Sequence, residues 1–348
     1  MWTRLSRLLA STVTSLALMA GMTVATPSLA HAAVNAPADG YGFTDGASII
    51  TMPLADLNRE LDAVAKTGAR WFRVQIDWSV IEPVKGQYDW GYVDRTIDAA
   101  RAHNLKVLGL IAYTGAWARP PGSFFSAFPN DPADYGDFAA AVVSRYGDRV
   151  SHWELWNEPN LPLFSGFTVS NGARYTELLK AAYPAIKRVQ PNSTVVSAGL
   201  SRLLGEDSPP AFMAQMYAAG AQGFFDAAAA HPYVFPAGLA GDTDNGWSDV
   251  GRMHDVMAAN GDGGKKIWMT ELGAPTSAPS AQGVSQSEQT RQILDVLSAA
   301  AGTGYSGPAF IFSIRDTDSS NPNNLEANCG ALLTTDWQPK ATAAALAR

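Results

Sequence analysis

Short apolar strands alternate with amphipathic helices along most of this chain, and this alternation constrains the fold more than any other feature. Apolar residues at helical spacing, such as Leu57, Leu61 and Val64, precede an apolar run that is typical of a buried strand. Strands are predicted at 71–78, 106–111, 153–158, 194–197, 224–233, 268–273 and 309–314. Strands separated by single helices and short connections form a parallel sheet with right-handed crossovers.

Two folds fit this alternation: a closed (β/α)8 barrel and an open doubly wound sheet. The number of predicted strands approaches eight, and no glycine-rich turn follows the first of them, which disfavours the nucleotide-binding form of the open sheet. Single-domain α/β barrels also commonly reach this length, and the chain shows no linker or repeat. We therefore expect a single-domain (β/α)8 TIM barrel over residues 34–348.

The N-terminal residues 1–33 have the pattern of a secretory signal peptide. A start with two arginines is followed by a largely apolar stretch at 8–24 and by the small-x-small sequence Ala-His-Ala at 30–32. The stretch is too polar for a membrane span of about 20 apolar residues. We expect secretion to the extracellular space or cell envelope, without stable membrane insertion.

Charge and cysteine content narrow the possible partners. The chain has a net charge of −7, which disfavours nucleic acid as a partner. Cys329 is the single cysteine, so no internal disulfide is possible and a large core must supply the stability. No His-x-His pair or His/Asp cluster follows the first predicted strand, so we expect neither a metal nor another cofactor. A monomer is expected.

Two predicted strands end in a glutamate. Residues 153–160 read Trp-Glu-Leu-Trp-Asn-Glu-Pro-Asn, and residues 268–273 read Trp-Met-Thr-Glu-Leu-Gly. Each run then breaks at a proline or glycine, which places Glu158 and Glu271 at the carboxyl rim of the sheet. A pair of carboxyl groups in this position suits the cleavage of a glycosidic bond.

Side chains alternate between the interior and the helix layer along a barrel strand, and this alternation sorts the neighbouring residues. Glu154 shares the side of Glu158 but lies roughly 13 Å lower, at about 3.3 Å per residue, so it is expected to be a buried acid with a structural partner. By the same rule Trp153 and Trp268 are expected to face the helices, as packing residues.

These motifs resemble the retaining glycoside hydrolases of clan A, and are most similar to family 39 and to cellulase-like members of family 5. The resemblance extends over nearly the whole of the chain after the signal. Residues 70–78 resemble the second barrel strand of these enzymes, and His231-Pro232-Tyr233 resembles the sixth.

The resemblance implies a role for each of five residues. Glu158 would be the general acid/base and Glu271 the nucleophile, with their carboxyl groups about 5 Å apart. The roles require Glu158 to start protonated and Glu271 ionised. Arg73 would keep Glu271 ionised, Tyr233 would donate a hydrogen bond to it, and Asn157 would bind the sugar 2-hydroxyl.

Other candidate residues for substrate binding have a second interpretation. His231 contacts the sugar or is a hydrogen-bonded core histidine. Asp77 contributes to the substrate site or is the buried ion-pair partner of Arg73. Trp78 and Trp117 stack on sugar rings or pack the top of the barrel.

Long loops at 119–131, 160–172 and 316–330 are expected to shape the cleft. Phe164 and Phe167, in the second loop, are further candidates for stacking on sugars. The eighth strand departs from the clan pattern, because phenylalanines stand where a tryptophan is usual. Phenylalanine cannot hydrogen bond, so the resemblance does not carry the identity of the sugar over to this chain.

The sequence therefore predicts a secreted retaining hydrolase of a β-linked polysaccharide or oligosaccharide, similar to a cellulase or xylosidase. One alternative is an exo-acting glycosidase on a cell-envelope glycan such as a galactofuranan. Another is a carbohydrate-binding barrel without activity. The presence of both carboxylates together with Arg73, Asn157 and Tyr233 disfavours the last.

Overall fold

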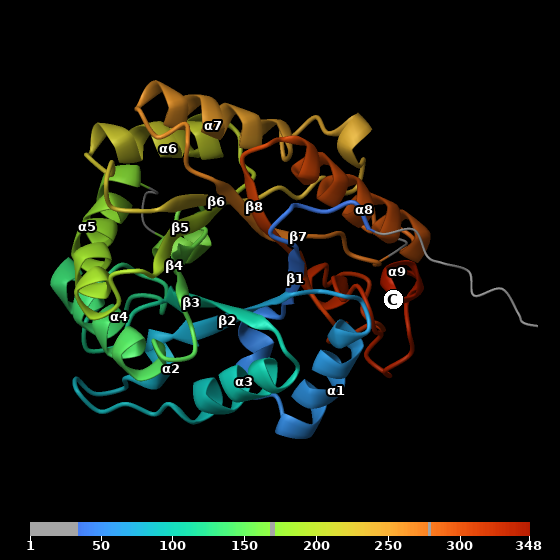
Figure 1. The fold of residues 1–348 in the computed structure, drawn as a ribbon, viewed down its shortest axis with the longest axis horizontal. Helices are drawn as coiled ribbons and strands as arrows, with labels where there is room; N and C mark the ends of the chain where they lie inside the picture. The colour runs from blue at the N-terminus through green and yellow to red at the C-terminus, as the bar shows by residue number, and fades with distance from the viewer. Residues whose placement is uncertain (1–33, 168–170, 278–279) are drawn as a thin grey trace, which may run out of the picture. The chain divides into compact units, whose positions relative to one another are not determined.

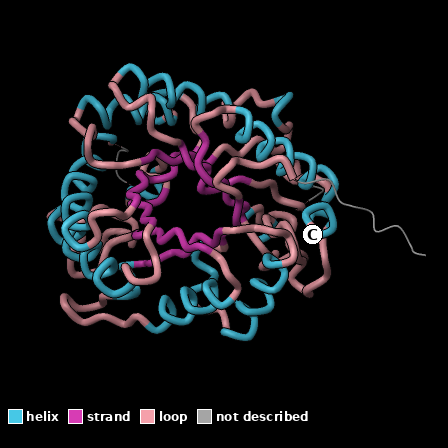
Figure 2. The backbone as a smooth tube through the Cα atoms, viewed as in Figure 1, coloured by secondary structure: helices cyan, strands magenta, loops and turns pink. Residues whose placement is uncertain are grey.

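The computed structural model describes residues 34–167, 171–277 and 280–348, so the predicted signal peptide lies outside the described residues. Eight parallel strands form a closed barrel in the order β1 to β8, with β8 paired to β1. Figure 1 shows the helices around the ring of strands, and Figure 2 shows the same two layers in the backbone alone. The predicted (β/α)8 barrel is confirmed.

The strands are β1 Tyr41–Thr44, β2 Trp71–Asp77, β3 Lys106–Ala112, β4 His152–Asn157, β5 Thr194–Ser201, β6 Ala227–His231, β7 Ile267–Leu272 and β8 Ser306–Phe312. The helices are α1 Leu54–Ala65, α2 Trp78–Ile81, α3 Gly91–Ala102, α4 Pro132–Tyr146, α5 Gly172–Val189, α6 Pro209–Ala218, α7 Ser248–Ala259, α8 Gln286–Gly302 and α9 Ala341–Leu346. None of these described helices is both long and apolar enough to cross a membrane.

Strand β1, which the sequence pattern did not locate, closes the barrel between β2 and β8. It is only four residues long and contains Gly42. A Cβ atom at Gly42 would lie 2.2 Å from the backbone oxygen of Trp71, so this position requires glycine. The glycine thus lets the backbones of β1 and β2 come as close together as the closed barrel requires.

The lower interior of the barrel is filled by aromatic and small side chains from different strands. Trp268 packs edge-on against Trp71, with ring centroids 5.5 Å apart, and lies nearly parallel to Phe310 at 6.5 Å. Strand β6 contributes only alanines to this layer, which leaves room for the large rings. The prediction that Trp268 faces the helices is wrong, because the register of β7 shifts against β8 and breaks simple alternation.

Trp153 lies on the outside of the barrel wall, as predicted. Its indole nitrogen donates to the side-chain oxygen of Gln190, which caps α5, at 2.8 Å. The packing side chains of β4 therefore face the helices, whereas its polar side chains face the interior of the barrel.

Candidate active site

A cavity of about 600 Å³ opens at the carboxyl ends of the strands. This is the end of a (β/α)8 barrel at which active sites are found. Glu158, which follows β4, and Glu271, in β7, both line it. The other lining residues are Gly46, Ala47, Gln75, Asp77, Tyr113, Phe124, Phe125, Asn157, Leu163, Phe164, Tyr233, Phe235, Phe312, Leu325, Glu326 and Cys329.

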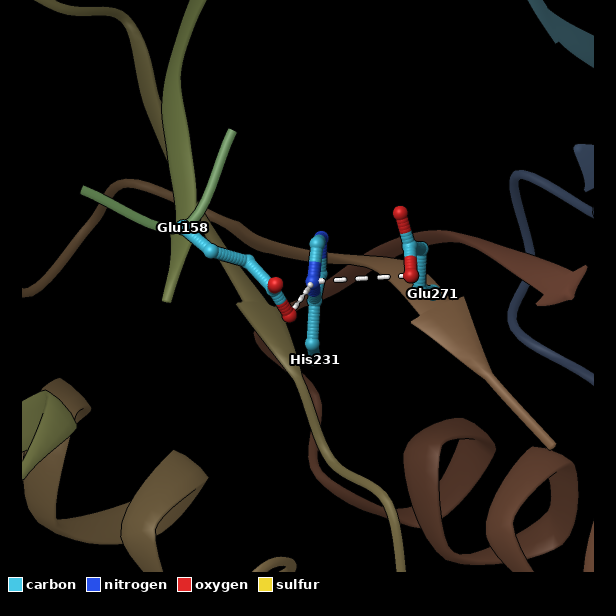
Figure 3. A group of neighbouring side chains, drawn as sticks. All are labelled: Glu158, His231 and Glu271. Atoms are coloured by element: carbon cyan, nitrogen blue, oxygen red, sulfur yellow. Dashed lines mark hydrogen bonds and ion pairs between the residues drawn. The ribbon is translucent and has the colours of Figure 1, made fainter. Parts of the chain in front are cut away.

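Glu158 and Glu271 approach each other from two strands, with His231 of β6 between them (Figure 3). One carboxylate oxygen of each glutamate and one ring nitrogen of His231 all lie within 4.8 Å of one another. Retaining glycosidases have carboxyl groups about 5–5.5 Å apart, whereas inverting enzymes need about 6.5–9.5 Å for an intervening water. The separation seen here fits the retaining geometry.

Glu271 is held by a cation and a hydroxyl. Arg73 Nη1 donates to Oε1 at 2.7 Å, and the Tyr233 hydroxyl donates to Oε2 at 2.8 Å. Both contacts were expected from the sequence. Burial by itself raises the pKa of Glu271, but the charges of His231 and Arg73 and the hydrogen bonds from Tyr233 and Arg73 outweigh burial and hold the pKa below its ordinary value. Glu271 is thus kept as an anion, the form that a nucleophile needs.

Arg73 connects Glu271 to a second, more deeply buried carboxylate, that of Glu154. It is only 1% exposed, and it binds Glu154 through Nε at 2.6 Å and Nη2 at 3.2 Å. Its Nη2 also donates to Asn157 Oδ1 at 2.9 Å. Glu154 is therefore the buried acid with a structural partner that the sequence indicated, and its partner is Arg73.

Asp77 is not the ion-pair partner of Arg73. It lines the cavity, and its carboxylate accepts hydrogen bonds from the backbone and hydroxyl of Ser79 and from Gln75 Nε2. Burial raises the pKa of Asp77 in spite of these hydrogen bonds. Asp77 remains in position to contact a substrate.

His231 lies behind the two acids. Its Nδ1 is 2.8 Å from Glu158 Oε1, and its Nε2 is 3.1 Å from the hydroxyl of Thr270. That hydroxyl donates its one proton to Glu154 Oε1 at 2.8 Å, so Nε2 of His231 must carry the hydrogen in their bond. His231 is only 1% exposed and does not line the cavity, so the bonded core histidine is the interpretation that the structure supports.

The fixed Nε2 hydrogen determines how His231 can bond to Glu158. In neutral His231, Nδ1 is an acceptor, and the hydrogen bond then requires a proton on Glu158. In protonated His231, Nδ1 donates to an ionised Glu158. Burial lowers the pKa of His231, but the carboxylates of Glu271 and Glu158 outweigh burial and raise it. The raised pKa of His231 favours its protonated form, whose Nδ1 donates to Glu158 next to the cavity.

Comparisons with known proteins agree with this geometry. A family model described as beta-galactosidase matches residues 52–131. A family 39 glycoside hydrolase from the gut symbiont Bacteroides cellulosilyticus WH2 is similar over 90% of this chain and 63% of its own, with 25% identity and a TM-score of 0.69. The chain resembles the clan A retaining glycoside hydrolases. This confirms the resemblance predicted from the sequence motifs.

Other solved structures share the fold at lower identity. A monomeric beta-xylosidase from Caulobacter crescentus CB15 is 18% identical, with a TM-score of 0.66, over 90% of this chain and 69% of that one. A GH5_18 protein from Streptomyces cattleya is also 18% identical, with a TM-score of 0.68, over 89% of this chain and 79% of that one. The chain spans less than two thirds of the length of the Bacteroides protein. The O-glycosyl hydrolases are the class of enzyme that these comparisons support.

Two tryptophans that the sequence suggested as sugar-stacking residues do not line the cavity. Trp78 is fully buried, stacks on Phe138 at 5.2 Å between ring centroids and donates to Glu82. Trp117 packs edge-on against Trp78, and its indole nitrogen donates to the backbone oxygen of Glu82 at 3.1 Å. Both pack the loops above β2 and β3. Phe164 lines the cavity as suggested, and Phe167 packs edge-on against the lining residue Phe124.

Several lining residues were not predicted from the sequence. Glu326 adds a fourth carboxyl group to the cavity lining, and burial, together with the charges of Glu271 and Glu158, raises its pKa. Cys329 is buried, and burial raises the pKa of its thiol, which makes it a weak nucleophile at neutral pH. Both belong to the loop after β8, where no strand periodicity marks a residue as part of the site.

Proposed function

We propose that this protein is a retaining O-glycosyl hydrolase that cleaves β-glycosides. The observation that carries the proposal is the pair formed by Glu158 and Glu271, with carboxylate oxygens within 4.8 Å of each other and with different neighbours. Arg73 and Tyr233 keep Glu271 anionic, whereas Glu158 faces a histidine that can share its proton. A barrel that only binds carbohydrate has no need for a nucleophile held in this way.

The reaction proceeds by two displacements at the anomeric carbon. In the first, a Glu271 oxygen forms a bond to that carbon, the bond to the leaving oxygen breaks, and the proton of Glu158 passes to that oxygen. In the second, Glu158 takes a proton from water, the water oxygen attacks the anomeric carbon, and the ester to Glu271 breaks. Asn157, held by Arg73, is placed to bind the sugar 2-hydroxyl.

The substrate class in this proposal follows from the sequence and from the nature of the similar proteins. These include a beta-xylosidase and an exo-beta-1,4-mannosidase, both of which act on β-linked sugars. Endo-acting cleavage of a β-linked polysaccharide and exo-acting removal of a sugar from a cell-envelope glycan both fit. We further propose, from the pattern of residues 1–33, that the enzyme is exported, and that it acts as a monomer.

Hydrolysis of aryl β-glycosides tests the proposal. The panel contains 2,4-dinitrophenyl and methyl derivatives of glucose, xylose, mannose and galactofuranose, and released phenol and sugar are measured. Glu271→Gln should lose at least about 10⁴-fold in kcat on every active substrate, because it lacks the nucleophile. Glu158→Gln should lose far more on methyl than on dinitrophenyl glycosides, since dinitrophenolate leaves without a proton.

Glu177→Gln is the control, because Glu177 lies on the outer helix α5 with its side chain 50% exposed. It should behave as the unmodified protein does. Full activity of Glu271→Gln, or equal losses in Glu158→Gln on both leaving groups, would contradict the proposed roles.

A further inference from the structure

One wall of the cavity is formed by apolar side chains. It is formed by Phe124 and Phe125, from the loop after β3, and by Leu163 and Phe164, from the loop after β4. Phe124 is 39% exposed and Leu163 is 43% exposed, although both are large apolar residues. These four residues are called the apolar wall.

Aromatic contacts extend the apolar wall from Tyr113, inside the cavity, to the exposed Phe167. Tyr113 lies parallel to Phe164 at 6.0 Å between ring centroids and packs edge-on against Phe125 at 5.0 Å. Phe125 contacts Phe124 at 4.4 Å, and Phe124 contacts Phe167 at 5.2 Å. A ligand that follows these rings stays on apolar surface from the cavity to its rim.

The backbone carbonyl groups of the apolar wall are also already hydrogen bonded. The carbonyl of Phe124 accepts from Ala127 N at 3.0 Å, and the carbonyl of Phe125 accepts from Thr114 N at 3.2 Å. The carbonyls of the other two wall residues are bonded as well: Leu163 O accepts from the Ser126 hydroxyl, and Phe164 O accepts from Trp156 Nε1 at 2.9 Å.

A sugar ring placed against this wall would therefore have poor partners for its hydroxyl groups. Aromatic rings do stack on sugars, but the hydroxyls at the ring edge then need donors and acceptors, which tyrosine and tryptophan can supply and phenylalanine cannot. A buried hydroxyl without a partner weakens binding. Tyr113 adds one hydroxyl beside the wall. Most of the polar lining residues lie elsewhere in the cavity, around the two acids: Gln75, Asp77, Asn157, Tyr233 and Glu326.

The apolar wall is connected to Glu158 through the loop after β4. Leu163 and Phe164 belong to the same loop as Glu158, and the Ser126 hydroxyl bonds this loop to the one that carries Phe124 and Phe125. In the proposed reaction Glu158 gives its proton to the leaving oxygen, so the departing group lies next to Glu158. Glu271, which binds the sugar carbon, lies across the cavity on β7.

We infer that the substrate is a β-glycoside whose leaving group is an apolar alcohol with an alkyl chain, as in a glycolipid. The inference rests on the proposed function and deepens it. The sugar is bound among the polar residues around the two acids, and the alkyl chain lies along the apolar wall. After the alcohol has taken the proton of Glu158, it leaves along the wall toward Phe167.

The test compares leaving groups on one sugar. Octyl and methyl β-glycosides of glucose and xylose are assayed beside cellobiose and xylobiose, with octyl glycosides kept below the micelle concentration. Each methylene that leaves water improves binding up to about fourfold. The octyl glycoside should therefore exceed the methyl glycoside in kcat/KM by at least about 30-fold, and it should also exceed the disaccharide of the same sugar.

A variant of the apolar wall and a matched control variant test whether the wall causes the preference for the octyl glycoside. The double variant Phe124→Ser with Leu163→Ser should lower the octyl-to-methyl ratio at least tenfold. Val189→Ser should keep the ratio, because Val189 is 40% exposed, like Phe124, but lies at the far end of α5. Thermal unfolding of both variants checks that they fold. An octyl-to-methyl ratio near one, or preference for the disaccharide in the unmodified protein, overturns the inference.

Failure of the proposed function is distinguishable from failure of this inference. If even dinitrophenyl glycosides are not hydrolysed, the proposed function fails. The inference is then tested by calorimetric titration of the unmodified protein with octyl and methyl β-glucoside. Binding of the octyl compound at least about 30-fold tighter than the methyl compound supports the apolar wall as its site. Equal binding of the two compounds overturns it.

Discussion

The Tyr233 hydroxyl is a neutral donor to Glu271, and its removal has a predictable effect on pH dependence. Tyr233→Phe removes a hydrogen bond that stabilises the carboxylate, so the pKa of Glu271 rises. A higher pKa means that Glu271 stays protonated, and inactive, up to a higher pH. The acidic limb of the kcat/KM profile should therefore move to higher pH.

At the pH optimum the same variant should lose about 10- to 100-fold in kcat/KM, since a hydrogen bond to a charged group contributes about 1.5–3 kcal/mol. The pH profile of dinitrophenyl glycoside hydrolysis measures both effects. An unmoved acidic limb would show that the hydroxyl does not tune Glu271.

At the scale of secondary-structure elements, a buried pair of carboxyl groups joins β1, α1 and the loop after β8. Asp45 Oδ1 accepts from Ile314 N at 2.9 Å, and Glu60 Oε1 accepts from Arg315 Nε at 2.6 Å. Their other oxygens, Asp45 Oδ2 and Glu60 Oε2, are buried without another partner. Burial, and then the neighbouring Asp45, raise the pKa of Glu60, so the two carboxyl groups hold a proton between them.

This proton makes the stability of the barrel depend on pH. Because the folded-state pKa of Glu60 lies above the unfolded value, the folded chain binds the extra proton between the two. The stability that this proton contributes is therefore fully present below the unfolded pKa, and it is lost as pH rises, by up to about 1.4 kcal/mol per pH unit, until the folded-state pKa is passed.

Glu60→Gln should flatten this dependence. A glutamine amide can donate to Asp45 and still accept from Arg315, so no proton is needed at this position. Urea unfolding from pH 5 to 9 measures the effect, with Glu177→Gln as the exposed control. A slope equal to that of the unmodified protein would rule the pair out as its source.

The sequence located most elements because seven of the eight strands are apolar runs between helical patterns. Strand β1 was not predicted, since its four residues include a glycine and form no periodic run. The alternation of side chains between the two faces of a strand predicted their orientation less well near the site. Trp156, at φ 78°, and Glu158, at φ 45°, depart from strand geometry, so Asn157 and Glu154 face the same Arg73 although three positions separate them.

Candidate site residues were predictable where a motif places them in a barrel strand or just after it. Glu158, Glu271, Arg73 and Tyr233 lie where the motifs place them, and their mutual contacts follow from the closure of the barrel. Trp78 was misplaced because strand β2 ends at Asp77 and the chain turns into α2, which buries the ring. The loop residues of the apolar wall carry no periodic pattern, and only packing between two loops brings them together.

At the scale of the whole molecule, a buried lysine secures the C-terminal part of the chain. Lys340 Nζ lies 3.0 and 3.2 Å from the oxygens of Asp316 and 2.6 Å from the Thr276 hydroxyl, and both charged side chains are almost inaccessible. Lys340 precedes α9, Asp316 follows β8 and Thr276 follows β7. The contact therefore fixes the long loop that carries Glu326 and Cys329 into the cavity.

Lys340→Met should lower the free energy of unfolding by about 3–5 kcal/mol, because it leaves the buried Asp316 carboxylate without its cation. The double variant Lys340→Met with Asp316→Leu should regain a large part of that loss, since it removes both charges. Urea unfolding measures both. A single variant as stable as the unmodified protein would contradict this account.

Arg73 binds a structural carboxylate, Glu154, and the proposed nucleophile, Glu271, with one guanidinium group, and this has a consequence for engineering the proposed enzyme. In a Glu271→Gly variant, made to build glycosidic bonds from glycosyl fluorides, the guanidinium keeps Glu154 but faces a vacated space. That space remains electropositive and is large enough for a small anion. We expect azide or formate to enter it and to restore turnover by attacking the sugar from the side that Glu271 leaves open.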